Sequence, residues 1–82
     1  MKASAITRRL EFGEDNEQTY KESISPCNFD QGEIFSWTVI NDDNGIPDFI
    51  TLITKRGISM EIEYDENILS SLAAEFRSRG VL

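Results

Sequence analysis

Residues 58–64 carry the most regular pattern in the chain, with apolar side chains at every second position and polar ones between them: Ile58, Met60, Ile62 and Tyr64. Successive side chains of a β-strand point to opposite faces of a sheet, so this alternation predicts a strand with one buried and one solvent-facing side. Such a strand is stable only inside a larger sheet with another layer packed on its apolar side. The rest of the chain must supply both.

The covering layer is predicted directly after this strand. Asp65 is a good N-cap, and Glu66 places negative charge in the first turn, where the helix dipole favours it. Apolar side chains then recur at helical spacing, at Ile68, Leu69, Leu72, Ala73 and Phe76. Arg77 and Arg79 have the sign that suits a helix C-terminus, and Gly80 suits its termination. We therefore expect one amphipathic helix at this end of the chain.

Four further segments are predicted to be strands from their alternation or their β-branched and aromatic residues: Ser4–Phe12, Gln18–Ser25, Glu33–Ile40 and Ile46–Thr54. The second of these is short and polar and is expected to be an edge-type strand. In the first, Ile6, Leu10 and Phe12 form the expected inner face, and Arg8 is the exception on that face. Pro26 is expected to close the second strand, because proline cannot donate to a ladder of hydrogen bonds.

The third and fourth of these segments are expected to form a hairpin. Asn44-Gly45 lies between them, and both residues accept the positive φ that a tight turn needs. In the third strand the pattern places one apolar set, Phe35, Trp37 and Val39, on one face and a second set, Ile34, Thr38 and Ile40, on the other. The strand is therefore apolar on both sides.

These elements predict an α+β fold, an antiparallel β-meander of about five strands with one C-terminal α-helix packed on one face. A chain of 82 residues is too short for a second core, so we expect one domain over residues 1–82. One helix covers only one face of the sheet. Either the first strand and residues 27–32 fold over the other face, or that face is exposed as a dimer or partner surface. Trp37 and Tyr20 are the side chains we expect first at such a surface.

Composition excludes several kinds of chemistry. The chain has no histidine and one cysteine, which removes histidine-based triads, histidine-containing zinc sites and internal disulfides. Cys27 has no activating partner and is expected to be a small hydrophobe. Residues 41–45 resemble a calcium loop in their oxygen ligands, but the spacing fits a hairpin turn instead. We expect no enzymatic activity, no metal and no cofactor. Neither a signal peptide nor a membrane-spanning run is recognised, so a cytoplasmic location is expected.

Fifteen acidic residues against eight basic ones give a net charge of −7, which disfavours direct binding of nucleic acid. The acids cluster, and six of them are candidate partner-binding residues: Asp42, Asp43, Glu61, Glu63, Asp65 and Glu66. Glu61, Glu63 and Asp65 are spaced two residues apart, so in an extended strand their carboxylates point to the same face at intervals of about 6.6 Å. This spacing is comparable to that of successive phosphates and permits mimicry of a nucleic-acid backbone. They can equally be a solvated face that keeps the protein soluble.

The sequence therefore leads to a non-enzymatic binding module whose acidic surface engages a basic protein partner. Its most concrete form is an inhibitor or antagonist that blocks the nucleic-acid-binding site of another protein. The alternative is a structural or accessory subunit that forms homo-oligomers, such as a homodimer, through an apolar sheet face.

Overall fold

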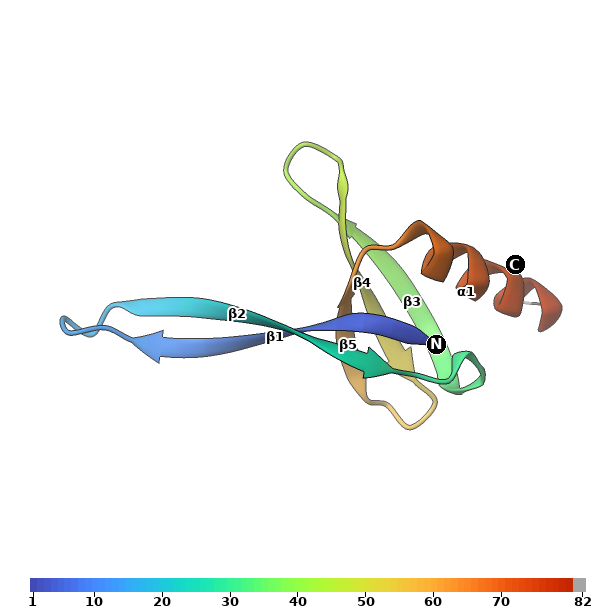
Figure 1. Cartoon of the computed structure of the whole chain (residues 1–82), viewed down its shortest axis with the longest axis horizontal. Helices are drawn as coiled ribbons and strands as arrows, with labels where there is room; N and C mark the ends of the chain where they lie inside the picture. The colour runs from blue at the N-terminus through green and yellow to red at the C-terminus, as the bar shows by residue number, and fades with distance from the viewer. Residues whose placement is uncertain (81–82) are drawn as a thin grey trace.

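The computed structural model describes residues 1–80. It contains one sheet and one C-terminal helix, in the chain order β1 (Lys2–Phe12), β2 (Gln18–Asn28), η1 (Gln31–Glu33), β3 (Ile34–Asn41), β4 (Pro47–Thr54), β5 (Ser59–Glu63) and α1 (Glu66–Ser78) (Figure 1). All neighbouring strands are antiparallel. The α+β fold with five antiparallel strands and one C-terminal helix is thus confirmed.

The strands do not follow one another across the sheet as they do in a continuous meander. Their order is β2-β1-β5-β4-β3, so the first and last strands of the chain pair in the middle of the sheet. The contact is short and involves two residue pairs, Ala5 with Ile62 and Ile6 with Glu61. Strands β2 and β3 are consecutive in the chain but form opposite edges.

The connection between these two edges shows how strongly the sheet coils. Phe29 still pairs with Met1, so only residues 30–33 separate the end of β2 from the start of β3. A flat five-stranded sheet is about 19 Å from edge to edge. A link that contains a turn of 3₁₀ helix, rising about 2.0 Å per residue, cannot span that distance. The sheet therefore coils until its edges approach each other at this end.

Helix α1 packs on the concave side of the coiled sheet and closes the core. The buried apolar side chains come from both layers and from the β2–β3 link: Phe29, Ile34, Ile50, Leu52, Ile62, Ile68, Leu72 and Phe76. The helical stripe is confirmed, and so is the N-cap, because the Asp65 carboxylate accepts hydrogen bonds from the N–H groups of Asn67 and Ile68. Met60 and Tyr64 pack against this core from β5.

The predicted grouping of the β3 side chains is wrong at its first residues. The register with β4 shifts between Ile34 and Ser36, so that two residues, Phe35 and Ser36, lie opposite Ile53. This irregularity changes the phase of the alternation. Ile34 is consequently buried and Phe35 is exposed, whereas Trp37 and Val39 face the core as a pair.

Pro26 does not close the second strand. Strand β2 runs on to Asn28, with Pro26 paired opposite Ser4 in an unbroken register. Because β2 is an edge strand, a proline is tolerated wherever its missing N–H would point away from the sheet. The edge position agrees with the short, polar, edge-type strand that the sequence predicts here.

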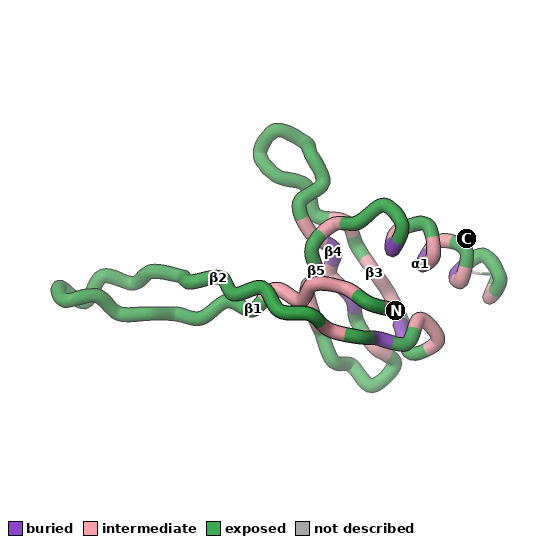
Figure 2. The backbone as a smooth tube through the Cα atoms, in the orientation of Figure 1, coloured by how far each residue is buried: buried purple, intermediate pink, exposed green. Residues whose placement is uncertain are grey.

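Strands β1 and β2 continue far beyond the rest of the sheet as a two-stranded ribbon, here called the arm (residues 7–23). The molecule measures 52 × 30 × 19 Å, and the arm projects along its longest axis (Figure 1). The expected inner face of the first strand is wrong. Ala5 pairs with the buried Ile62, so Ile6, Leu10 and Phe12 lie on the opposite side of the sheet from the core, and Leu10 and Phe12 are exposed. Beyond Ile6, β1 also has no neighbour in β5, and the arm is exposed along its length (Figure 2).

Candidate interaction face

One side of the sheet has no covering layer. The β2–β3 link packs on the same side as the helix, where Phe29 joins the core, and leaves the other side uncovered. We call this side the open face. Strand alternation relative to the buried Ile50, Leu52 and Ile62 assigns its members: Ile6, Arg8, Leu10, Phe12, Tyr20, Glu22, Ile24, Thr38, Ile40, Phe49, Thr51, Ile53, Glu61 and Glu63. It is continuous from the body of the sheet to the tip of the arm.

The arm contributes the most exposed apolar part of the open face. Met1 and Phe29 exchange both backbone hydrogen bonds, and the Gly13 N–H donates to the Glu17 carbonyl at the other end of the ladder. Hydrogen-bonded and non-hydrogen-bonded pairs alternate between these ends, so Leu10 and Tyr20 form a non-hydrogen-bonded pair, whose side chains approach more closely. Phe12 and Tyr20 nevertheless remain 64% and 72% exposed.

Arg8 joins the arm to the body on this face. Its Nε donates to Glu22 Oε1 of β2 at 3.1 Å, and its Nη1 forms an ion pair with Glu61 of β5. The guanidinium also lies 4.9 Å from the centre of the Phe49 ring in β4, a cation–π geometry. Arg8 therefore contacts three other strands. In the sequence, Arg8 was visible as the one charged residue on the face formed by Ile6, Leu10 and Phe12. Its role could not be inferred until the structure showed which residues it contacts.

The six acidic candidates do not form one row. Glu61 is engaged by Arg8, and Asp65 caps α1. Asp42 is held in the β3–β4 turn, where its Oδ1 accepts hydrogen bonds from the N–H groups of Asn44 and Ile46. The remaining three are exposed, with Glu63 on β5, Glu66 in the first turn of α1 and Asp43 in the β3–β4 turn.

The two aromatic candidates lie on opposite sides of the sheet. Tyr20 is on the open face of the arm. Trp37 is half-buried on the helix side, where its ring meets Phe76 edge-on at 6.0 Å between ring centres. The open face instead exposes apolar residues that the pattern placed inside or did not single out: Leu10, Phe12 and Ile24.

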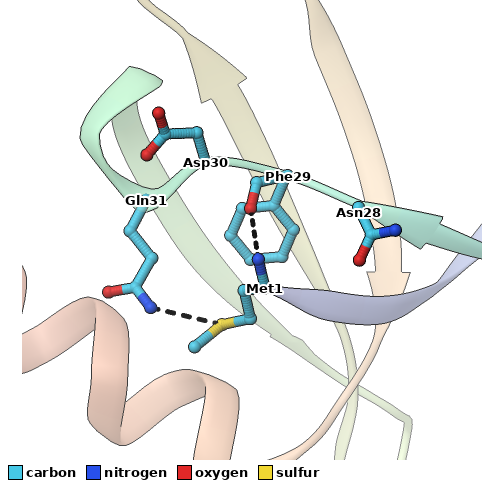
Figure 3. A pocket seen from close by; sticks show the side chains of 5 residues that line it. All are labelled: Met1, Asn28, Phe29, Asp30 and Gln31. Carbon is cyan, nitrogen blue, oxygen red and sulfur yellow. Dashed lines mark hydrogen bonds between the residues drawn. The ribbon is translucent and has the colours of Figure 1, made fainter.

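A hollow of about 470 Å³ lies beside the β2–β3 link (Figure 3). Its lining consists of Met1, Asn28, Phe29, Asp30 and Gln31. The one carboxylate there, that of Asp30, accepts a hydrogen bond from the Gly32 N–H as the cap of η1. The Gln31 side chain points to the sulfur of Met1, with Nε2 and Sδ 3.8 Å apart. These contacts hold the link in place and present no pair of acid and base.

Within residues 1–80, no three His, Cys, Asp or Glu side chains gather closely enough to hold a metal ion. No helix in the same range is long and apolar enough to cross a membrane. Comparisons with protein-family models, with curated proteins and with solved structures gave no match to this chain. Its function must therefore be argued from the open face and the arm.

Proposed function

We propose that the chain is a non-enzymatic protein-binding module that engages its partner through the open face. The observation that carries this proposal is the exposure of Leu10, Phe12 and Tyr20 together on one side of the arm. Contiguous apolar patches on a soluble domain mark interaction surfaces, and aromatic side chains dominate the energetics of such surfaces. A ribbon of two strands is marginally stable on its own, and a partner packed on it would add the layer that it lacks.

Charge supports a basic partner. Three acidic residues flank the turn at the tip of the arm, Glu14, Asp15 and Glu17, and Glu63 lies on the open face itself. An acidic rim around an apolar strip steers a partner of opposite charge and discourages acidic ones. The most concrete form is an inhibitor or antagonist that occupies the nucleic-acid-binding cleft of another protein, with the cytoplasm as its compartment.

The test uses two variants that change different parts of the surface. One removes apolar side chains, Phe12→Ser with Tyr20→Ser, and the other removes charge, Asp43→Asn with Glu63→Gln. Each protein and the wild type are immobilised and exposed to lysate, bound proteins are eluted with rising salt and identified, and the affinity is then measured with the purified partner. We expect one basic protein, released by salt, with binding reduced about tenfold or more by loss of the aromatics.

The matched control alters the other face of the arm. Thr19→Ala with Ser23→Ala changes residues of the same strand whose side chains point away from the open face. Equal loss of affinity in this control would contradict the proposal, as would full affinity in the variant without Phe12 and Tyr20. If the charge variant alone lost binding, the acidic surface rather than the apolar strip would carry recognition.

A structural or accessory subunit that assembles through the same apolar side chains is the second candidate. This candidate rests on the same exposed apolar side chains, but its partner is a second copy of the chain stacked on the open face. The two are separated by comparing the mass of the purified wild type in solution with that of the Phe12→Ser, Tyr20→Ser variant. Assembly through this face would be abolished by Phe12→Ser with Tyr20→Ser.

A further inference from the structure

The two edges of the sheet differ in their regularity. Strand β3, at one edge, has two shifts in its register, between Ile34 and Ser36 and between Ile40 and Asn41. Such irregularities are a common means of protecting an edge from pairing with another chain. Strand β2, at the other edge, pairs with β1 over eleven residues with no shift, and almost all of it is exposed. The ladder at one edge is therefore irregular, whereas the other edge is regular and offers every outward N–H except that of Pro26.

The hydrogen-bond phase identifies the free groups of β2. Because Met1 pairs with Phe29 and Gly13 with Glu17 through hydrogen bonds, the even-numbered residues of β2 direct their N–H and C=O groups away from β1. These include Tyr20, Glu22 and Ile24. Pro26 falls on an outward position as well, which is why the ladder inside the sheet tolerates it. The outward groups are spaced to receive an extended strand.

We propose that β2 pairs antiparallel with β2 of a second copy, about a two-fold axis at Ser23, and joins two sheets into one. This inference goes beyond the proposed function, because it uses the edge of the sheet and leaves the open face free. The axis stands perpendicular to the sheet, so the open faces of both copies lie on the same side of the joined sheet. A dimer of this kind presents two open faces to a partner at once.

Ser23 is favoured as the centre because it lies in the middle of β2, so the whole strand overlaps with its copy. An axis at Lys21 would set two lysines opposite each other, and an axis at Glu22 two glutamates, which destabilises a strand pair. With the axis at Ser23, Glu22 lies opposite Ile24 of the partner subunit and Lys21 opposite Ser25 of the partner subunit. No like charges then meet across the axis.

The size of the contact and the charge of the chain set the strength of the dimer. Eleven residues extend over about 37 Å, and a sheet edge is about 10 Å deep, so both copies together bury roughly 740 Å² before side-chain relief is counted. This lies below the roughly 1,000 Å² of a stable specific interface, so we expect a weak dimer. Both copies carry a net charge of −7, so salt should strengthen the dimer by screening their repulsion. Binding to a basic partner has the opposite salt dependence.

The decisive experiment is cross-linking by single cysteines in a Cys27→Ser background. Two residues at the axis form a non-hydrogen-bonded pair with Cα atoms about 4.5 Å apart, within the range of a disulfide. Diamide oxidation of Ser23→Cys should therefore give a covalent dimer. Ser25→Cys is the matched control, because its two copies lie about 14 Å apart along the strands and cannot be bridged. A mixture of Ser25→Cys and Lys21→Cys should cross-link to each other.

Sedimentation equilibrium supplies an independent measurement that needs no cysteine. The wild type should dimerise more strongly as salt rises. Glu22→Pro removes an outward N–H without touching the backbone bonds to β1 and should weaken the dimer about tenfold. Glu22→Ala also loses the carboxylate that Arg8 contacts but keeps the N–H, so it is the matched control and should not weaken the dimer. A monomer at millimolar concentration in high salt, or equal cross-linking of Ser23→Cys and Ser25→Cys, would overturn the inference. A monomer that still binds a basic protein through Phe12 and Tyr20 would overturn the β2–β2 dimer and leave the proposed function standing.

Discussion

The guanidinium of Arg79 reaches back 45 residues and donates a hydrogen bond from Nη1 to the carbonyl oxygen of Ile34, at 2.6 Å. Its Nη2 donates to the carbonyl oxygen of Gln31 at 2.7 Å, so one side chain holds both ends of the turn between β2 and β3. The same guanidinium lies 4.8 Å from the centre of the Phe76 ring. The end of α1 thereby fixes the link that keeps the two edges of the sheet close together.

Replacement of Arg79 should therefore destabilise the whole fold. Arg79→Ala removes charge-assisted hydrogen bonds to two carbonyl oxygens, and we expect the free energy of unfolding to fall by about 2 to 3 kcal/mol. Arg77→Ala removes an exposed charge from the same turn and should cost less than about 0.5 kcal/mol. Urea denaturation followed by circular dichroism measures both. Similar losses in the two variants would show that Arg79 acts only through its charge at the helix end.

Arg8 is expected to control the arm and to have less effect on the core. Arg8→Ala removes the contacts to Glu22, Glu61 and Phe49, so the arm loses its anchor on the body while Ile50 and Leu52 stay buried. Hydrogen exchange of backbone amides in residues 7–23 should accelerate several-fold, with little change in β4. Arg9→Ala is the control, since Arg9 points to the other face of the arm. Acceleration of the same size in both variants would contradict this role for Arg8.

The elements themselves were predictable because each depends on local chemistry. The alternation in β5, the cap at Asp65 and the turn at Asn44-Gly45 are confirmed, and Gly45 has the positive φ, 77°, that the turn requires. The strand order was not predictable in this way. It depends on the pairing of Ala5 with Ile62, residues from opposite ends of the chain, and no local pattern records which strands become neighbours.

The candidate site was only partly predictable for the same reason. Tyr20 was singled out as an aromatic side chain for an interaction surface and is indeed exposed, but Leu10 and Phe12 look identical to core residues in sequence. Their exposure follows from their position on the open face, which no layer covers, and from the absence of a neighbour for β1 beyond Ile6. The predicted faces of β3 failed at Phe35, because the register shift places Phe35 and Ser36 together opposite Ile53. Simple alternation contains no signal for such a shift.

Apolar residues of the open face should contribute little to folding. Phe12→Ser changes a side chain that is already mostly solvated, and we expect the free energy of unfolding to change by no more than about 0.5 kcal/mol. Leu72→Ala removes a fully buried side chain and should cost about 2 to 5 kcal/mol. Thermal and urea denaturation compare the two. A large loss from Phe12→Ser would mean that the arm packs on the body in solution, and would remove the surface on which the proposed function rests.

Asp65 and Glu66 are neighbours with separable roles. Asp65→Ala removes the hydrogen bonds from the N–H groups of Asn67 and Ile68 and should lower the free energy of unfolding by about 1 kcal/mol. The affinity of the folded variant for a partner should not change. Glu66→Gln keeps the cap and removes one exposed charge, so its effect on stability should be about 0.3 to 1 kcal/mol. Denaturation and partner affinity are measured for each variant. A loss of affinity in folded Asp65→Ala would contradict the assignment of Asp65 to capping alone.

The pairing of β1 with β5 also sets the order in which the protein can assemble during synthesis. The first hairpin leaves the ribosome long before its neighbour in the sheet exists, because β5 is the last strand to be made. Strands β3, β4 and β5 with α1 are contiguous in the chain and contain most of the buried side chains, so they can collapse together. Until β5 has been made, the outer edges of β1 and β2 are both unpaired. Pairing of Ala5 with Ile62 then completes the sheet.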